Sequence, residues 1–257
     1  MIHTTAIIHP GARIGSNVGI GPYSIVGDNV EIGEGCHIGS HVIIDGPTRL
    51  GKNNRIYHHC SIGANPQDKK YNVEADSALE IGNDNTIREF CSINRGTAGG
   101  GGTTRLGDRN WIMAYVHIAH DCIIGHANTL ANNTTLAGHV TVDDHVILGG
   151  FTGIHQFCRL GSHSFAAIAS VITRDVPPYV LVAGNTAEPT GLNREGLKRI
   201  GMEPARIDVL RQAYRILYRE GLLLKDALAR LDTLGTDFPE VAAFAAFIRG
   251  SERGIVR

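Results

Sequence analysis

An aliphatic residue returns every six positions along most of this chain. Ten such residues run without a break from Ile8 to Ile62, and later runs span Ile81 to Ile93 and Leu106 to Ile172. Ile, Leu or Val fills 24 of the 25 positions in this register. A six-residue unit is too short for a helix pair and fits one side of a triangular parallel β-helix, whose coils stack about 4.8 Å apart. Three units make a coil, so we expect about eight coils.

Two further positions of the unit support this register. Small or medium residues stand four places after each aliphatic residue, and we interpret the cysteines there as small buried hydrophobic residues rather than ligands or disulfide partners. All five cysteines fall in this position: Cys36, Cys60, Cys91, Cys122 and Cys158. Glycine directly follows the aliphatic residue in 12 of 25 units, which we attribute to tight turns with positive φ. Stacked aliphatic side chains would also explain why only 6% of residues are aromatic.

The repeat stops near Pro177 and Pro178, and two adjacent prolines are expected to end the strand ladder. A different pattern begins near Asn193, where apolar residues take the three-to-four spacing of helices. This spacing is seen at Leu210, Tyr214, Leu217 and Tyr218, and in the stretches Leu222–Leu234 and Pro239–Arg249. We therefore predict a β-helix catalytic domain over residues 1–187 and a C-terminal α-helical domain over residues 188–257.

Two insertions interrupt the repeat, near residues 64–78 and 96–103. Counting three units per coil predicts that both leave the prism at the same corner, on successive coils. The first insertion carries Asp68 and Lys70, whereas the second is rich in glycine. Because loops on a rigid scaffold often carry function, this corner is the first place to look for chemistry.

Histidines gather at the same corner on the following coils. The residues that share this edge or approach it are His117, His120, Gly138, His139, His155 and Gln156. A histidine has a pKa suited to removing a hydroxyl proton near neutral pH, and Asp121 follows His120 as a candidate orienting partner. Gly138, stacked on His120, offers a backbone N–H for an oxyanion. Because no Gly-x-Ser-x-Gly motif is present and no cysteine is well placed, direct acyl transfer to an alcohol is favoured.

Several local motifs sharpen this interpretation. They are His117-Ile118-Ala119-His120-Asp121-Cys122, Leu130-Ala131-Asn132-Asn133, Leu136-Ala137-Gly138-His139-Val140, His155-Gln156-Phe157-Cys158, Asp175-Val176-Pro177-Pro178-Tyr179 and Asn193-Arg194-Glu195-Gly196-Leu197-Lys198-Arg199. With these motifs the chain resembles, over nearly its whole length, the hexapeptide-repeat UDP-N-acetylglucosamine O-acyltransferases of lipid A synthesis. The resemblance implies a left-handed β-helix, a homotrimer with sites between adjacent prisms, an (R)-3-hydroxyacyl thioester of acyl carrier protein as donor, and the glucosamine 3-hydroxyl of UDP-N-acetylglucosamine as acceptor.

The same resemblance implies a role for each site residue. His120 would be the general base, polarised by Asp121, and the Gly138 N–H would stabilise the oxyanion. The sugar, diphosphate or acyl groups would be held by Asp68, Lys70, His117, His139, His155 and Gln156. The uridine end would be recognised by Asn193, Glu195 and Arg199. Ile168 stands where the family regulates acyl-chain length, so we expect a medium or short chain, and Asn94 stands where relatives often carry histidine.

Three alternatives remain at this point. Another hexapeptide acyl- or acetyltransferase could use a coenzyme A or carrier-protein donor. A γ-type carbonic anhydrase would need three zinc-binding histidines, and His117 and His139 are suitably spaced, but Asp144 stands where the third would be. An ice-binding or scaffold β-helix would show a regular array of exposed threonines instead of histidines and inserted loops. We expect no metal and no cofactor.

Charge bears on partners and location. The net charge is -1, but residues 190–257 carry twelve basic and nine acidic side chains. Arg211, Arg215 and Arg219 form one helical stripe that could steer an acidic carrier protein, whereas the overall charge argues against nucleic acid. No run of about 20 apolar residues is present, so no transmembrane segment is expected. The first 20 residues do not resemble a signal peptide, and we expect a cytoplasmic enzyme.

Overall fold

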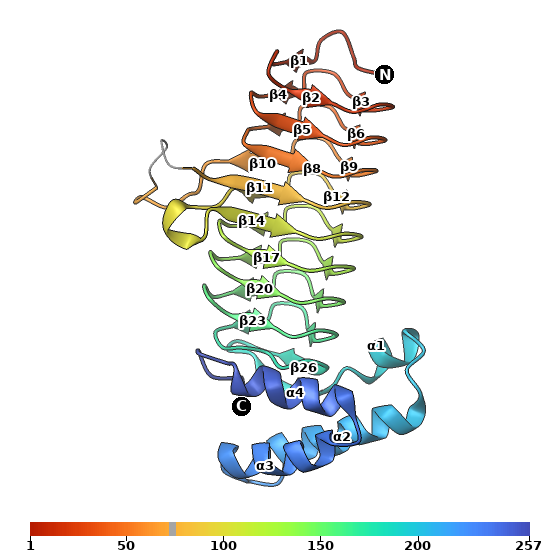
Figure 1. Cartoon of the computed structure of the whole chain (residues 1–257), viewed down its shortest axis with the longest axis vertical. Coiled ribbons are helices and arrows are strands. Elements are labelled where there is room, and N and C mark those ends of the chain that lie inside the picture. The colour runs from red at the N-terminus through yellow and green to blue at the C-terminus, as the bar shows by residue number, and fades with distance from the viewer. Residues whose placement is uncertain (72–75) are drawn as a thin grey trace.

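The computed structural model describes residues 1–71 and 76–257. The chain winds into a long three-sided prism of parallel strands, and helices cover its C-terminal end (Figure 1). In Figure 1 the strands of the front sheet run from left to right while the chain descends, so the coil is left-handed. This confirms the expected fold, although most parallel β crossovers are right-handed.

Three parallel sheets form the sides of the prism, and the chain visits them in the order B, C, A. Sheet B contains β1 (Ile7–Ile8), β4 (Ile25–Val26), β7 (Ile43–Ile44), β10 (Ser61–Ala64), β13 (Ser92–Asn94), β16 (His117–Ile118), β19 (Thr135–Leu136), β22 (Gly153–Ile154) and β25 (Val171–Ile172). Sheet C contains β2 (Arg13–Ile14), β5 (Val30–Ile32), β8 (Thr48–Leu50), β11 (Ala78–Ile81), β14 (Thr103–Leu106), β17 (Ile123–Ile124), β20 (Thr141–Val142) and β23 (Arg159–Leu160). Sheet A contains β3 (Gly19–Ile20), β6 (His37–Ile38), β9 (Arg55–Ile56), β12 (Thr86–Ile87), β15 (Trp111–Ile112), β18 (Thr129–Leu130), β21 (Ile147–Leu148), β24 (Phe165–Ala166), β26 (Val180–Ala183) and β27 (Glu188–Leu192).

The repeated aliphatic residues form the core, as predicted. They stack in register from coil to coil, so that Ile118 pairs with Leu136 and Leu136 with Ile154. Their side chains point into the prism and are almost completely buried, except for the partly buried Ile8 and Ile14 of the first coil. The five cysteines are also buried and carry free thiols, which confirms their interpretation as small core residues.

The reason why glycine often follows the aliphatic residue differs from the one predicted. All 12 glycines of this position lie in the described part of the chain, and among them only Gly63 has a positive φ. Positive φ instead occurs two residues later, at corner residues such as Asp121 and His139. A Cβ on Gly33 would lie 2.5 Å from the carbonyl oxygen of Gly51 on the next coil. Glycine is therefore needed here because two backbones approach closely.

The predicted end of the strand ladder is wrong by one coil. Strand β26 follows the two prolines and still pairs in parallel with β24, and β27 then pairs antiparallel with β26. Pro177 and Pro178 lie in the corner before β26, where the turn does not need their missing N–H groups. The predicted boundary between the two domains, after residue 187, stays a prediction. Strand β27, which begins just beyond it, completes sheet A.

Four helices cover the end of the prism: α1 (Arg194–Arg199), α2 (Pro204–Tyr218), α3 (Leu224–Gly235) and α4 (Pro239–Arg249). Their positions confirm the helical stretches predicted from apolar spacing. Arg206 of α2 donates two hydrogen bonds to the buried Glu240 of α4, at 2.7 and 3.0 Å, and so joins these helices. In residues 1–71 and 76–257 there is no helix with the length and apolar character needed to cross a membrane.

Candidate active site

Both insertions leave the prism where sheet B turns into sheet C, and we call this edge the B–C corner. The first insertion follows β10 and the second follows β13, on adjacent coils, as predicted (Figure 1). The second insertion contains a short 3-10 helix, Ala98–Gly100. Residues 72–75 of the first insertion lie outside the described residues. The two loops therefore flank the edge on which the sequence placed the histidines.

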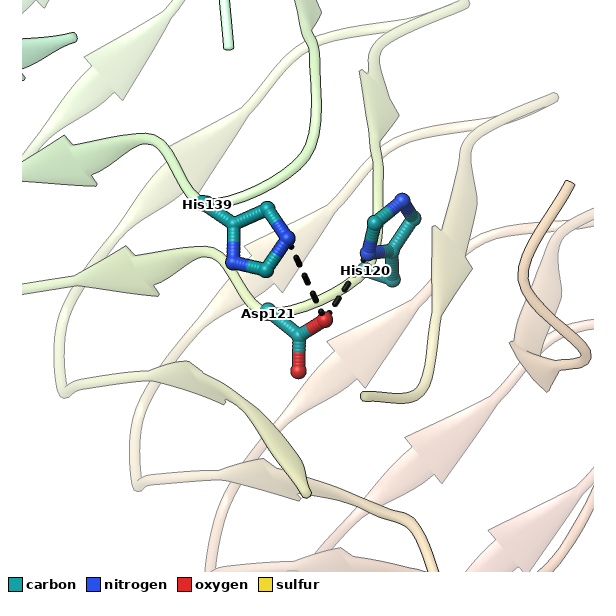
Figure 2. A group of neighbouring side chains, drawn as sticks. All are labelled: His120, Asp121 and His139. Carbon is teal, nitrogen blue, oxygen red and sulfur yellow. Dashed lines mark hydrogen bonds and ion pairs between the residues drawn. The ribbon is translucent and has the colours of Figure 1, made fainter. Parts of the chain in front are cut away.

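His120 and Asp121 form a hydrogen-bonded pair at this corner. His120 Nδ1 lies 2.8 Å from Asp121 Oδ2, and His139 Nε2 lies 3.8 Å from the same oxygen (Figure 2). Adjacent residues on a strand point apart, but the positive φ of Asp121 at the turn brings its carboxylate beside its neighbour. The Asp121 side chain is 0% exposed, whereas His120 retains 17% exposure and is open to a substrate.

The carboxylate of Asp121 is held by the second insertion. Thr97 donates its backbone N–H to Oδ1 at 2.9 Å and its hydroxyl to Oδ2 at 2.7 Å. Burial alone would raise the pKa of Asp121, but the hydrogen bonds from Thr97 and His120 outweigh it and hold that pKa below its ordinary value. Asp121 is thus an anion that fixes the Nδ1–H tautomer of His120, and Nε2 has no hydrogen-bond partner among the described residues.

Gly138 lies directly against the His120 ring, as the register predicted. A Cβ at this position would stand 2.6 Å from His120 Cε1 and 2.8 Å from Nε2, so no larger residue fits. Gly138 is buried, and its N–H has no acceptor among the described residues. An N–H without an acceptor beside a base is what a developing oxyanion requires.

A cavity of about 300 Å³ opens between the two insertions and these side chains. It is lined by Asp68, Lys70, Tyr71, Thr97, Ala98, Gly99, His120 and His139. The structure thus brings Asp68 and Lys70 of the first insertion to the histidines, as predicted. Larger cavities of about 550 Å³ on sheet A and about 980 Å³ along sheet C lie away from His120 and His139, so volume alone does not locate the chemistry.

Arg95 joins the roots of both insertions, a role that sequence reasoning missed. This buried side chain donates to the Tyr71 hydroxyl at 3.1 Å and to Asn65 Oδ1, Gly46 O and Gly63 O. Its neighbour Asn94 donates to the carbonyl of Asn65 at 3.1 Å. Asn94 therefore supports the first insertion, and its buried Oδ1 has no partner in the part of the chain that the structure describes.

His117 faces outward from sheet B on the approach to the corner. Its Nδ1 lies 2.7 Å from the hydroxyl of Ser92, one coil earlier. Burial, with a smaller contribution from His120, lowers the pKa of His117, so the ring is neutral at physiological pH. His155 and Gln156 are exposed, one coil beyond Gly138.

Four other predicted residues are not brought to this corner within one chain. Asn193 caps α1 and donates to the carbonyl of His163, which lies at the corner between sheets C and A. Glu195 and Arg199 belong to the same short helix, where Glu195 pairs with Lys198 at 3.1 Å. Ile168 is 71% exposed at the corner between sheets A and B.

In residues 1–71 and 76–257, the one group of His, Cys, Asp or Glu side chains close enough to share a cation is His120, Asp121 and His139. The carboxylate oxygens in this group are already engaged by Thr97 and by His120. The His120 atom nearest the carboxylate is Nδ1, which serves that hydrogen bond rather than a cation. The arrangement is therefore that of an oriented base.

The chain matches family models for "Udp N-acetylglucosamine O-acyltransferase; Domain 2" over residues 175–256 and for six hexapeptide repeats of bacterial transferases over residues 11–46 and 103–138. Over its whole length it is 51% identical to the acyl-[acyl-carrier-protein]–UDP-N-acetylglucosamine O-acyltransferase of Thiobacillus denitrificans and covers 99% of that protein. This chain belongs to the UDP-N-acetylglucosamine O-acyltransferase family.

Solved structures of the family share the whole fold. The chain superposes on the Francisella novicida acyltransferase with a TM-score of 0.98 at 43% identity, covering 100% of this chain and 94% of that one. The Arabidopsis acyltransferase gives a TM-score of 0.90 at 39% identity, with both chains fully covered. The chain is therefore an enzyme of this acyltransferase family. Its membership of the family does not favour the carbonic anhydrase and scaffold alternatives.

Proposed function

We propose that this enzyme transfers an (R)-3-hydroxyacyl group from acyl carrier protein to the 3-hydroxyl of the glucosamine in UDP-N-acetylglucosamine, the first step of lipid A biosynthesis. The observation that carries the proposal is the His120–Asp121 pair beside the unpartnered N–H of Gly138. Membership of the acyltransferase family supports the choice of substrates. The proposed reaction needs no metal or cofactor, because both proton transfers involve His120.

The proposed reaction proceeds by direct attack. His120 Nε2 removes the proton of the sugar hydroxyl while its oxygen bonds to the thioester carbonyl carbon. The Gly138 N–H stabilises the negative oxygen of the tetrahedral intermediate. When the intermediate collapses, the carbon–sulfur bond breaks, and the imidazolium returns its proton to the carrier-protein thiolate. Asp121 stays ionised throughout and stabilises the imidazolium through Nδ1–H.

Binding of UDP-N-acetylglucosamine is assigned to both loops and to a second copy of the chain. Lys70 offers a cation for the diphosphate beside Asp68 and His139, while His117, His155 and Gln156 extend the site along the prism. Asn193, Glu195 and Arg199 lie at another corner of the same chain and cannot close this cavity themselves. A homotrimer that sets α1 of one prism against the B–C corner of the next would supply them.

The acyl chain is proposed to lie on sheet B. Outward residues between His117 and Val171 are small there, and a Cβ on Gly153 would meet no atom within 4 Å. Ile168 stands about two and two-thirds coils beyond His120, roughly 13 Å along the prism at 4.8 Å per coil. This exposed side chain would block a longer chain, which supports preference for a medium or short acyl group.

Acyl carrier protein is an acidic partner, and α2 presents a suitable surface. Arg211, Arg215 and Arg219 are exposed along this helix, although Arg211 also pairs with Asp208 at 3.5 Å. Such a stripe favours encounter with an acidic protein. The free buried cysteines are consistent with the cytoplasm, where thiols stay reduced, and we assign the enzyme to that compartment.

The test is an acyl-transfer assay with carrier-protein thioesters of graded length, read by mass spectrometry. His120→Ala should abolish transfer, because the base is removed, while calorimetry still detects binding of UDP-N-acetylglucosamine. His37→Ala, on the exposed outer side of sheet A, is the matched control and should keep full activity. Near-normal turnover by His120→Ala would refute the base assignment. Equal use of acyl-coenzyme A would favour another hexapeptide acyl- or acetyltransferase.

A further inference from the structure

Thr97 makes more hydrogen bonds to the Asp121 carboxylate than any other described residue, yet it lies in a loop and not in a strand. It is the first residue of the glycine-rich loop after Gly96 and supplies two of the three hydrogen bonds that reach the Asp121 carboxylate. One bond goes to each oxygen, so the carboxylate cannot rotate without breaking at least one of them. The plane of the carboxylate, and with it the direction of Oδ2, is set from this loop.

The rest of the loop is folded around the same residue. Gly100 and Gly102 both donate their N–H groups to the Thr97 carbonyl, at 3.0 and 2.8 Å. This turn places the backbone of Gly100 directly over the pair. A Cβ on Gly100 would collide with the Asp121 carboxylate and stand 2.5 Å from His139 Cε1. The loop thus packs closely over Asp121, and glycine at position 100 allows the loop backbone to contact the carboxylate.

A second imidazole competes for the oxygen that Thr97 holds. His139 Nε2 lies 3.8 Å from Asp121 Oδ2, beyond hydrogen-bond distance, whereas His120 Nδ1 lies at 2.8 Å. Without the Thr97 hydroxyl, a small rotation would let Oδ2 approach His139 instead. The tautomer and orientation of His120 would then no longer be fixed, because both depend on an acceptor at Nδ1.

We propose that Thr97 is a positioning residue for acyl transfer: its hydroxyl and N–H hold the Asp121 carboxylate toward His120 Nδ1, which keeps Nε2 deprotonated and aimed at the acceptor hydroxyl. Thr97 acts through Asp121 and not through bonds to the reacting atoms. The inference rests on the proposed function, in which His120 is the base.

Thr97→Val tests this proposal because it removes the hydroxyl and keeps the shape of the side chain. We expect kcat to fall roughly 10- to 100-fold, the usual effect of losing a hydrogen bond to a charged group, with KM for UDP-N-acetylglucosamine unchanged. Thr97→Ser keeps the hydroxyl and should restore most of the activity. Thr129→Val, on the outer side of sheet A, is the matched control and should leave kcat unchanged.

Nitrogen-15 NMR of the His120 ring gives a readout that a merely structural role would not change. The native enzyme and Thr97→Ser should show a single Nδ1–H tautomer, and Thr97→Val a mixture of tautomers. Gly100→Ala is a second variant that tests the same proposal. Its methyl group would lift the loop from Asp121, and this displacement should lower kcat in the same way.

Three results would overturn the proposal. They are a native kcat in Thr97→Val, an equal loss in Thr97→Ser, and a loss of kcat without any change in the His120 tautomer. These results are separable from failure of the proposed function, because His120→Ala would still be inactive. If His120→Ala itself turned over normally, the proposed base would be wrong, whatever Thr97 did.

Discussion

At the scale of single residues, two imidazoles of the site, His120 and His117, each have one nitrogen fixed by a neighbour and the other left for substrate. Asp121 engages Nδ1 of His120, and Ser92 engages Nδ1 of His117. The two rings differ in their surroundings, since His117 is held against sheet B and burial lowers its pKa. His117 should therefore bind substrate as a neutral hydrogen-bonding group and not as a cation.

This state of His117 can be measured. In a proton NMR titration its ring signals should change at a pH below 6.5, the ordinary histidine value, because burial disfavours the charged form. At pH 6.5 the ring should be mostly neutral. His117→Gln identifies the signals by removing them. A titration midpoint at or above 6.5 would contradict the prediction.

Sequence reasoning reached some of these residues and not others, for physical reasons. The strict coil register places Gly138 on His120, and the same register pairs Ser92 with His117, although that pair was not recognised. Thr97 has no such signal, because the loop that carries it leaves the register. Arg95 was missed as well, because its hydrogen bonds depend on the path of the first insertion, which periodicity does not describe.

At the scale of strands and turns, the repeat accepts many kinds of side chain at positions that face outward. It leaves little space for atoms between the backbones of successive coils. Glycine follows the aliphatic residue because the next coil passes directly beneath it, as at Gly33 and Gly51. The positive φ values lie at the corners, mostly on residues other than glycine, where they let neighbouring side chains such as His120 and Asp121 converge. Composition alone could not separate the close approach of two coils from the positive φ at the corners.

Gly33→Ala tests the close approach. Its Cβ would stand 2.5 Å from the backbone oxygen of Gly51, which cannot move without disturbing the coil. Overpacking of this kind costs about 1–3 kcal/mol, so calorimetry should show a clearly lower melting temperature. Gly153→Ala, where a Cβ would meet nothing within 4 Å, should leave the melting temperature nearly unchanged. Equal effects of the two substitutions would show that the spacing between coils is not the cause.

At the scale of the whole molecule, one buried acid joins two of the helices, α2 and α4. Glu240 on α4 is 3% exposed, and hydrogen bonds from Arg206 on α2 hold its pKa below the ordinary value despite burial. A carboxylate with a lowered pKa stabilises the fold at neutral pH and loses this contribution as pH falls through the lowered value. The contact between α2 and α4 should therefore weaken at acidic pH.

Glu240→Gln should lower stability at pH 7 by about 1 kcal/mol, a modest value because Arg206 is half-exposed. The difference from the native protein should shrink as pH falls below about 4.3, the ordinary glutamate pKa, because the unfolded chain then binds protons that the native carboxylate resists. Thermal unfolding at several pH values measures both effects. Glu252→Gln, an exposed acid near the C-terminal end, is the control. A difference that stays constant with pH would contradict the assignment to ionisation of Glu240.

The regular stacking of coils also determines how such a chain can change in length. Strands on one side of the prism are 18 residues apart along most of its length, as for Ile118, Leu136 and Ile154. Gain or loss of 18 residues before the first insertion would only move the site along the axis. Six residues gained between the second insertion and His120 would instead turn everything that follows by a third of a revolution, and the loops would separate from the edge that carries His120. Growth by whole coils is thus the change in length that leaves this catalytic edge intact.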